Sequence, residues 1–194
     1  MRILHISDTH GRHRLLHDLP PADVIVHSGD VTDNGEDEEV LDFVEWFESL
    51  DYAHKLFIAG NHDTNLYGAT LDGLTEHTHF LYNSGITIEG INFYGIPYFV
   101  NDVKSGTFPR MVHAVPFSTD VLITHLPPLG VLDKASMHES SFELLNKVYE
   151  VKPCLHLFGH SHKDEGIEII DGITFSNAAM GEKEMMNQEH LFEI

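Results

Sequence analysis

Cysteine is almost absent from this chain, and so are long hydrophobic runs. The only cysteine among the 194 residues is Cys154, so no internal disulfide can form, which fits a reducing compartment. Cys154 stands in an apolar, strand-like run, and we expect it to be buried as a small hydrophobic residue. We find no signal-peptide pattern and no apolar run long enough to span a bilayer. The expectation is a soluble, cytoplasmic protein without a membrane partner.

Positive charge is also scarce. Lys and Arg number 11 against 31 Asp and Glu, which gives a formal net charge of −20. Such a chain is not expected to bind a nucleic-acid polymer or an anionic membrane. A phosphate substrate is compatible with this charge, because metal ions would reverse the field locally. Few cations are present to clamp a phosphate dianion, so a diester, whose phosphate carries one negative charge, is favoured.

The length and the apolar pattern predict one α/β domain over residues 1–194. Residues 1–60 read as strand, short helix, strand, long helix and strand, which indicates βαβ units and a parallel sheet. The long helix has an acidic face opposite an apolar stripe at helical spacing. The stripe consists of Val40, Leu41, Phe43, Val44, Phe47 and Leu50.

The second part of the chain is richer in strands. Residues 64–80 give no clear prediction, whereas the apolar stretches of residues 81–98, punctuated by turns, predict a β-hairpin or meander. Residues 99–118 show no period and are predicted to form a long loop, whose role stays open. Further elements are predicted as a helix near 140–150 and strands near 121–124, 154–158, 166–170, 173–176 and 190–194. This number of strands favours two stacked mixed β-sheets flanked by helices.

Polar side chains of a kind that binds metal follow five of the strand-like runs. Ligands of open α/β sheets bind at the carboxyl ends of the strands, and imidazole and carboxylate groups gathered there suit first-row divalent metals. The pattern therefore predicts a two-metal site. The five stretches are Asp8-Thr9-His10, Gly29-Asp30 running to Asp33, Gly60-Asn61-His62-Asp63, Thr124-His125 and Gly159-His160-Ser161-His162.

The residue types fit the two-metal hypothesis. Asp8 and His10 are two residues apart and can face the same way at the end of a strand. The two carboxylate oxygens of Asp30 could bridge two cations, and Asn61 offers a neutral oxygen that binds metal without adding charge. A single pair of this kind is more often a cap or a surface group, but the five stretches together in this order favour a metal site.

The order D-x-H, G-D-x-x-D, G-N-H-D, H and G-H-x-H resembles the calcineurin-like metallophosphoesterase superfamily over nearly the whole chain. Longer stretches, including residues 22–35 and 143–162, resemble the brain-type metallophosphoesterase-domain branch and its bacterial relatives. The resemblance implies a four-layer αββα sandwich, in which two β-sheets are flanked by helices. It also implies a hydrolase that acts on phosphoesters.

The resemblance assigns roles to ten residues of the five stretches. It implies that the first metal is held by Asp8, His10, Asp30 and His162, and the second metal by Asp30, Asn61, His125 and His160. It implies that His62 donates a proton to the leaving group, that Asp33 orients His62 and favours its charged form, and that Asp63 supports the motif without binding metal. Some vertebrate members of the branch have glycine at the position of His160.

The implied reaction is hydrolysis of a small phosphodiester, with a cyclic nucleotide among the candidates. A hydroxide that bridges two divalent ions would attack phosphorus in line with the leaving oxygen, and a histidine would protonate that oxygen. The ligand types accept Mn, Fe, Co, Ni or Zn, of which Mn is the preferred expectation.

Alternatives remain open at the level of sequence. The same scaffold could serve a phosphomonoesterase or protein phosphatase, or a nucleotide-binding module with little turnover. A redox di-metal protein is disfavoured, because it would need more carboxylate ligands, often in Glu-x-x-His pairs on helices. The sequence fixes neither the substrate nor the oligomeric state.

Other side chains receive weaker predictions. His5, His27 and His156 lie inside strands and are expected to be core histidines with hydrogen-bond partners. Surface or loop positions are expected for His13, His17, His54, His77, His79, His113, His138 and His190. A less favoured hypothesis places some residues of the irregular segment at the substrate pocket, namely Tyr98, Phe99, Asn101, Arg110 and His113.

Overall fold

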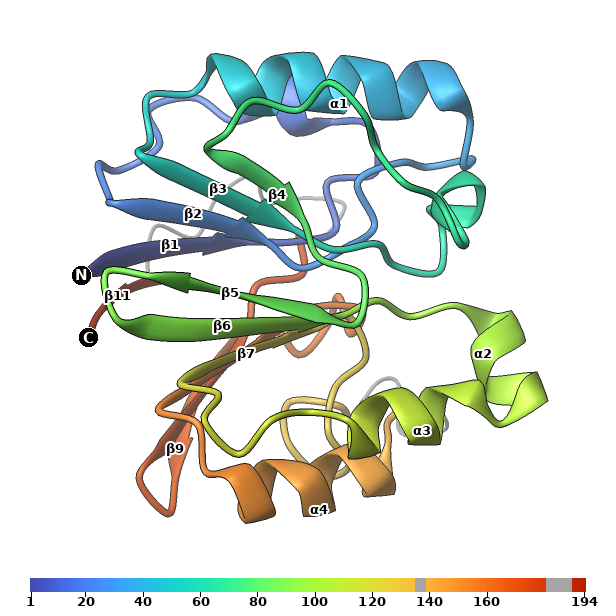
Figure 1. Ribbon diagram of the computed structural model, residues 1–194, viewed down its shortest axis with the longest axis vertical. Helices are drawn as coiled ribbons and strands as arrows, with labels where there is room; N and C mark the ends of the chain where they lie inside the picture. The colour runs from blue at the N-terminus through green and yellow to red at the C-terminus, as the bar shows by residue number, and fades with distance from the viewer. Residues whose placement is uncertain (135–138, 181–189) are drawn as a thin grey trace.

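Two stacked β-sheets form the centre of the molecule (Figure 1). The computed structural model describes residues 1–134, 139–180 and 190–194. The first sheet contains β1 (Arg2–Ile6), β2 (Val24–His27), β3 (His54–Phe57), β4 (Thr78–Phe80) and β11 (Leu191–Glu193). The second sheet contains β5 (Ser84–Ile88), β6 (Ile91–Ile96), β7 (Val121–Thr124), β8 (Leu155–Phe158), β9 (Gly166–Ile170) and β10 (Ile173–Asn177).

Both sheets are mixed. The first has the order β11-β1-β2-β3-β4 and the second the order β5-β6-β7-β8-β10-β9. Within each, the inner strands run parallel, while β11, β5 and β9 pair antiparallel with their neighbours. The predicted pair of stacked mixed sheets is therefore confirmed, as is the hairpin, which is β5 and β6. The ambiguous residues 64–80 contain the short 3-10 helix η2 (Thr64–Leu66) and β4.

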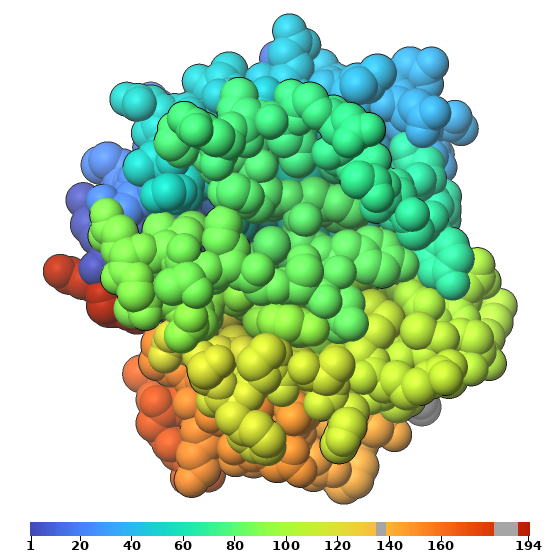
Figure 2. All heavy atoms as spheres, in the orientation of Figure 1, coloured from blue at the N-terminus to red at the C-terminus, as the bar shows by residue number. Residues whose placement is uncertain are grey.

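Side chains that alternate along the strands allow each sheet to pack on both faces, which gives four layers: helices, two sheets and helices. In β2, Val24 and Val26 belong to the apolar cluster between the two sheets, whereas Ile25 packs under α1 (Asp37–Ser49) on the outer face. Because side chains alternate across a strand, one strand supplies two apolar layers, and such strands read as near-continuous apolar runs. Figure 2 shows the β4–β6 region, in green, filling the join between the blue half that carries α1 and the orange half that carries α4 (Phe142–Val151).

Helix α1 begins with a capping box, in which the side chains of Glu36 and Glu39 each accept from the backbone N–H of the other. Its buried face contains Val40, Phe43 and Phe47, as the stripe predicted. The inclusion of Leu41 was wrong, because this side chain is 69% exposed. The helix instead buries Trp46, which is packed with the aromatic rings beneath α1.

The prediction of a loop over residues 99–118 was wrong. The segment contains the short helices α2 (Val100–Ser105) and α3 (Thr107–His113), separated by Gly106 in the left-handed conformation. Glycine adopts that conformation without strain, and the break leaves neither helix long enough to show a period. Helix α3 and α4 cover the outer face of the second sheet, where Met111 and Leu144 lie in one apolar cluster.

Three further side chains differ from their predictions. Cys154 is exposed and stands just before β8 rather than inside it. His13, in the 3-10 helix η1 (His13–Leu15), is fully buried against Trp46, and His190 is buried against Ser176. His138 lies outside the described residues. Across the ranges that the structure describes, no helix combines the length and apolar character needed to cross a membrane.

Candidate metal centre

All seven candidate ligands lie just beyond strand ends at one edge of the sandwich. Asp8 and His10 follow β1, Asp30 follows β2, and Asn61 follows β3. His125 comes directly after β7, and the pair His160 and His162 follows β8. The parallel strands of both sheets end on the same side of the molecule, next to α2 (Figure 1). Stacking of the sheets therefore brings together residues that are more than 150 positions apart in the chain, such as Asp8 and His160, whose backbone N–H lies 3.1 Å from Asp8 Oδ2.

The backbone at this edge is strained at several ligands. Asp8, His10, Asp30 and His160 have φ angles of 56°, 45°, 55° and 69°. Non-glycine residues rarely adopt such left-handed conformations, which cost about 1–3 kcal/mol each and cluster at functional sites. Backbone hydrogen bonds hold the turns, including His10 N–H to the Asp30 carbonyl at 3.0 Å. The strain indicates that side-chain placement here has been favoured over local backbone preference.

Glycines make room for the ligands. A Cβ atom on Gly60 would collide with the Asp30 carboxylate, and one on Gly159 would collide with the Asp8 carboxylate. A Cβ on Gly29 would lie 2.6 Å from His125 Nδ1. The three glycines of the sequence stretches thus allow the strand ends to approach each other closely.

The first cluster has the spacing of ligands around one ion. His162 Nε2 lies 3.1 Å from Asp8 Oδ1 and 3.2 Å from His10 Nε2, and His10 Nε2 lies 3.9 Å from Asp8 Oδ1. With metal–ligand bonds of about 2.1 Å, neighbouring ligand atoms on a tetrahedral or octahedral ion lie about 3.0–3.4 Å apart. Two of the three edges of this triangle agree with that spacing, and the third is slightly longer.

The second cluster shares a carboxylate with the first. His125 Nε2 lies 3.3 Å from Asp30 Oδ2 and 3.2 Å from Asn61 Oδ1. Ligand atoms of His160, Asp30 and His125 lie within 4.8 Å of one another. The same Asp30 Oδ2 is 3.8 Å from His10 Nε2 in the first cluster. Asp30 therefore stands between the two clusters, where one carboxylate could serve two cations.

Electrostatics favour positive charge at this position. Burial lowers the pKa of His125, but the Asp30 and Asp8 carboxylates outweigh it and raise the pKa to about 10. A hydrogen bond to Asp8 raises the pKa of His162. Burial opposes the charge of Asp8 and Asp30, but His125 and the hydrogen bonds to the two carboxylates together outweigh it and lower the pKa of both carboxyls. His10 Nδ1 is buried without a hydrogen-bond partner. The described residues therefore fit divalent cations in both donor type and charge.

Support from residues behind the ligands fixes their orientation. His125 Nδ1 lies 2.9 Å from the Ser28 carbonyl, which can only accept, so Nδ1 carries a proton and Nε2 is the nitrogen that would bind a metal, in exchange for its own proton. Asp63 is fully buried and accepts from the backbone N–H groups of Gly60, Val31 and Thr32 at 2.8–3.2 Å. Burial beside Asp30 raises the pKa of Asp63 to about 6. Asp63 thus joins the loops that carry Asp30 and Asn61.

His62 and Asp33 lie together at the open side of the clusters. His62 Nδ1 is 2.7 Å from the backbone carbonyl of Asp33, and the two rings of His62 and His10 meet edge to face at 4.6 Å. The Asp33 side chain is 60% exposed, with Oδ1 3.8 Å from His10 Nδ1. Asp33 therefore contacts His62 through its main chain and not through the carboxylate that the sequence pattern singled out. His62 also lies within ligand distance of His10 and Asp30.

Two neighbours of the clusters have no counterpart in the sequence predictions. An open pocket of about 530 Å³ is lined by His10, Arg12, Asp33, His62 and His162. Glu139 Oε2 lies 2.9 Å from His160 Nε2. Arg12 follows the D-x-H stretch by two residues, and that short distance was the available signal. Glu139 has no such signal, because a loop after β7 brings it to the site.

The irregular segment reaches the site only at its beginning. The Tyr98 ring lies 5.7 Å from the His160 ring and stacks on His125 at 6.3 Å. Phe99 and Asn101 line a small pocket with Asn61. His113 instead lines a pocket formed with α4, away from the ligand clusters. Arg110 contacts the Thr107 hydroxyl at 3.4 Å within α3. The hypothesis for this segment is thus retained for Tyr98, Phe99 and Asn101.

The architecture described above, with two mixed sheets flanked by helices and His and Asp side chains at the strand ends, is that of a metallophosphoesterase. The chain belongs to the calcineurin-like phosphoesterase family, whose model matches residues 1–164. Membership implies metal-dependent hydrolysis of phosphoesters. Proteins of this family generally bind divalent metals, and the His and Asp groups of this chain could hold them.

Comparison with individual proteins agrees with this assignment. The chain is 34% identical to UPF0046 protein K07C11.7 of Caenorhabditis elegans, over 94% of this chain and 71% of that protein. It is 32% identical to the human metallophosphoesterase domain-containing protein 1, over 92% of this chain and 66% of that protein. The solved structure of TT1561 from Thermus thermophilus has the same fold, with a TM-score of 0.64 at 13% identity over 92% of this chain and 89% of that one.

Proposed function

We propose that this chain is a phosphodiesterase that uses two divalent metal ions. Mn²⁺ is the preferred ion at both positions. The observation that carries the proposal is the shared position of Asp30 between two clusters of ligand atoms. The first ion would be held by Asp8, His10, Asp30 and His162, and the second by Asp30, Asn61, His125 and His160. Bound ions of this kind polarise the phosphoryl group and lower the pKa of a water molecule that attacks phosphorus.

His62 is proposed to protonate the leaving oxygen. The Asp33 carbonyl can only accept a hydrogen bond, so the proton of His62 Nδ1 is directed toward it. The proton that passes to the leaving oxygen is then the one on Nε2 of the doubly protonated ring, and His62 lines the open pocket. General acid catalysis by a positioned histidine typically contributes about 10²–10⁴ in rate. Glu39 supports this arrangement, because its carboxylate accepts from the backbone N–H groups of Asp33 and Asn34 at 3.0 Å.

Arg12 is proposed to bind the phosphate. Among the described residues that line the pocket of His62, it is the only Lys or Arg. A single guanidinium suits the single negative charge of a diester better than the dianion of a monoester. We expect Arg12→Ala to raise KM about tenfold. Arg14→Ala is the matched control, because Arg14 is paired with Asp42 on the surface.

The test compares two substrates on metal-free protein to which Mn²⁺ is added. We expect Mn²⁺-dependent hydrolysis, with kcat/KM for bis-p-nitrophenyl phosphate at least about tenfold above that for p-nitrophenyl phosphate. A preference for the monoester would contradict the diesterase proposal and indicate a phosphatase instead. Binding of nucleotide without any turnover would contradict the proposal of an enzyme and indicate a binding module instead. The single cysteine supports a reducing, cytoplasmic location for this activity.

A further inference from the structure

A second, smaller pocket opens beside the metal ligands. It has a volume of about 120 Å³ and is lined by Asn61, Thr64, Tyr67, Phe99, Val100 and Asn101. Asn61 belongs to this pocket and to the second ligand cluster, where its Oδ1 lies 3.2 Å from His125 Nε2. The next residue, His62, lines the larger pocket instead. The loop that carries Asn61 and His62 therefore separates two pockets.

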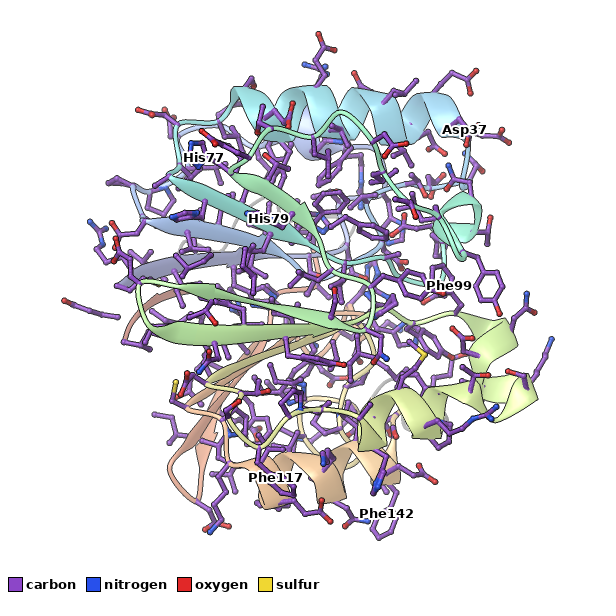
Figure 3. All side chains as sticks on the ribbon, in the orientation of Figure 1. Asp37, His77, His79, Phe99, Phe117 and Phe142 are labelled. Atoms are coloured by element: carbon purple, nitrogen blue, oxygen red, sulfur yellow. The ribbon has the colours of Figure 1, made fainter. Side chains whose placement is uncertain are left out.

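The wall of the small pocket is aromatic. Phe99 is 3% exposed and is fixed by two rings, since Tyr82 stacks on it at 5.9 Å and Tyr67 meets it edge to face at 5.1 Å. Tyr67 is 47% exposed, so its ring is available to a ligand. Its hydroxyl donates to Asp102 Oδ1 at 3.3 Å, which holds the ring beside α2. Figure 3 shows Phe99 at the side of the molecule where α2 stands.

The size of the pocket matches one ring. An apolar cavity of about 150 Å³ is known to accept benzene, and the space here is of the same order. Aromatic walls favour planar ligands, because stacked and edge-to-face contacts add to the burial of apolar area. Asn61, Thr64 and Asn101 also line the pocket, and their polar groups could hydrogen-bond a planar ring that carries heteroatoms.

The position of His62 decides which part of the substrate enters. In an in-line displacement the leaving group departs on the side of its proton donor, which here is the larger pocket. The ester substituent that stays on phosphorus must then lie on another side, and the small pocket is the described space next to Asn61. We propose that Tyr67 and Phe99 form a specificity subsite that binds a planar ring on the retained substituent of the diester. This inference rests on the proposed function.

The experiment uses two diesters with one leaving group. Phenyl p-nitrophenyl phosphate and methyl p-nitrophenyl phosphate differ only in the retained substituent. For the Mn²⁺-loaded protein we expect kcat/KM to favour the phenyl ester by about tenfold or more, as expected for one stacked ring. Tyr67→Ala should reduce this ratio about tenfold, whereas Tyr67→Phe, which keeps the ring and loses the bond to Asp102, should retain most of it.

The matched control is Phe142→Ala. Phe142 is a 57% exposed ring on α4, well apart from Phe99 in Figure 3, and its removal should leave the ratio as in the parent protein. An unchanged ratio in Tyr67→Ala, or no preference for the phenyl ester in the parent, would overturn the subsite.

A binding measurement separates this inference from the proposed function. Calorimetry should show that phenyl phosphate binds more tightly than methyl phosphate, and that Tyr67→Ala removes the difference. If neither diester were hydrolysed while this difference in binding persisted, the phosphodiesterase proposal would fail and the ring subsite would stand. Equal binding of the two ligands by the parent protein would sink the subsite even if both diesters were hydrolysed.

Discussion

Histidines inside the strands and histidines just beyond the strand ends have opposite surroundings. Inside the strands, side-chain hydroxyls are the partners: His27 Nε2 lies 3.0 Å from Thr9 Oγ1, and His156 Nε2 lies 2.9 Å from Thr124 Oγ1. Beyond the ends, carboxylates are the partners, as for His162 and Asp8 at 3.1 Å. Both kinds follow or interrupt apolar runs in the sequence. What separates a core histidine from a candidate ligand is therefore the group it faces across the sheet edge.

The charge state follows from this difference. Burial lowers the pKa of His27 and of His156 to about 3, which keeps both neutral at pH 7. At the edge, carboxylates overcome burial at His125 and raise its pKa to about 10, whereas burial lowers the pKa of His10 and of His160. Neutral histidines pack in the core, whereas the strand-end edge contains buried carboxylates whose negative charge favours a bound cation. The predictions below test each side of this comparison.

The largest effect is expected for Asp30→Ala. Removal of the shared carboxylate takes one ligand from each cluster, so tight binding of at least one ion should be lost. Metal ions supply several kcal/mol of transition-state stabilisation, so kcat/KM should fall by at least about a thousandfold. Metal analysis after gel filtration and steady-state kinetics measure the two losses.

Asp33→Asn is the control for this variant, because the Asp33 carboxylate is exposed and only its carbonyl contacts His62. It should keep both ions. Full activity and metal content in Asp30→Ala would show that the two clusters do not share a ligand.

The next effect is expected for His62→Ala, which removes a proton donor but no ligand. Both ions should remain, and the rate should fall by about 10²–10⁴ for a substrate with a poor leaving group. The defect should shrink for p-nitrophenyl esters, whose leaving group needs less protonation. Because His62 also lies within ligand distance of His10 and Asp30, loss of metal as severe as in Asp30→Ala would reassign it as a ligand.

A smaller effect is expected for His160→Gly. The change removes one nitrogen from the second cluster, while Asp8, His10, Asp30 and His162 of the first remain. The variant should fold, bind one ion tightly and the other weakly, and turn over slowly. Millimolar Mn²⁺ should restore part of the activity by mass action. Parental activity at limiting metal would mean that His160 serves only its contact with Glu139.

The smallest effect concerns the core side of the comparison. A histidine whose pKa is lowered on folding binds its proton more readily in the unfolded chain, so stability is complete above about pH 6.5 and declines toward the folded pKa of about 3. His156→Gln should therefore reduce the slope of unfolding free energy against pH by up to about 1.4 kcal/mol per unit in that range.

This slope is measured by urea unfolding in the presence of a chelator, so that loss of metal does not contribute. The control is His77→Gln, since His77 is an exposed histidine near β4 (Figure 3), and its slope should match that of the parent. A slope in His156→Gln equal to the parental one would contradict the account of His156 as a neutral core histidine.

The sequence predicted that the candidate ligands lie close together, because parallel strands end on one side of a sheet and residues placed after them meet there; their metal binding stays a prediction. It failed where placement depends on the tertiary fold. The helices α2 and α3 were missed because Gly106 divides them into pieces too short to show a period. The link between Asp33 and His62 runs through a backbone carbonyl, which a side-chain pattern cannot indicate. The roles proposed for Arg12 and Tyr67 depend on the two pockets that these residues line, and the sequence alone does not show those pockets.

The central claim is that Asp30 joins two ion sites, and metal stoichiometry tests it most directly. Protein purified with Mn²⁺ and passed through gel filtration should contain close to two ions per chain, and Asp30→Ala fewer than two. Titration of metal-free protein by calorimetry should reach the same value. A correctly folded chain that never binds more than one ion, at any Mn²⁺ concentration that leaves it soluble, would contradict the account.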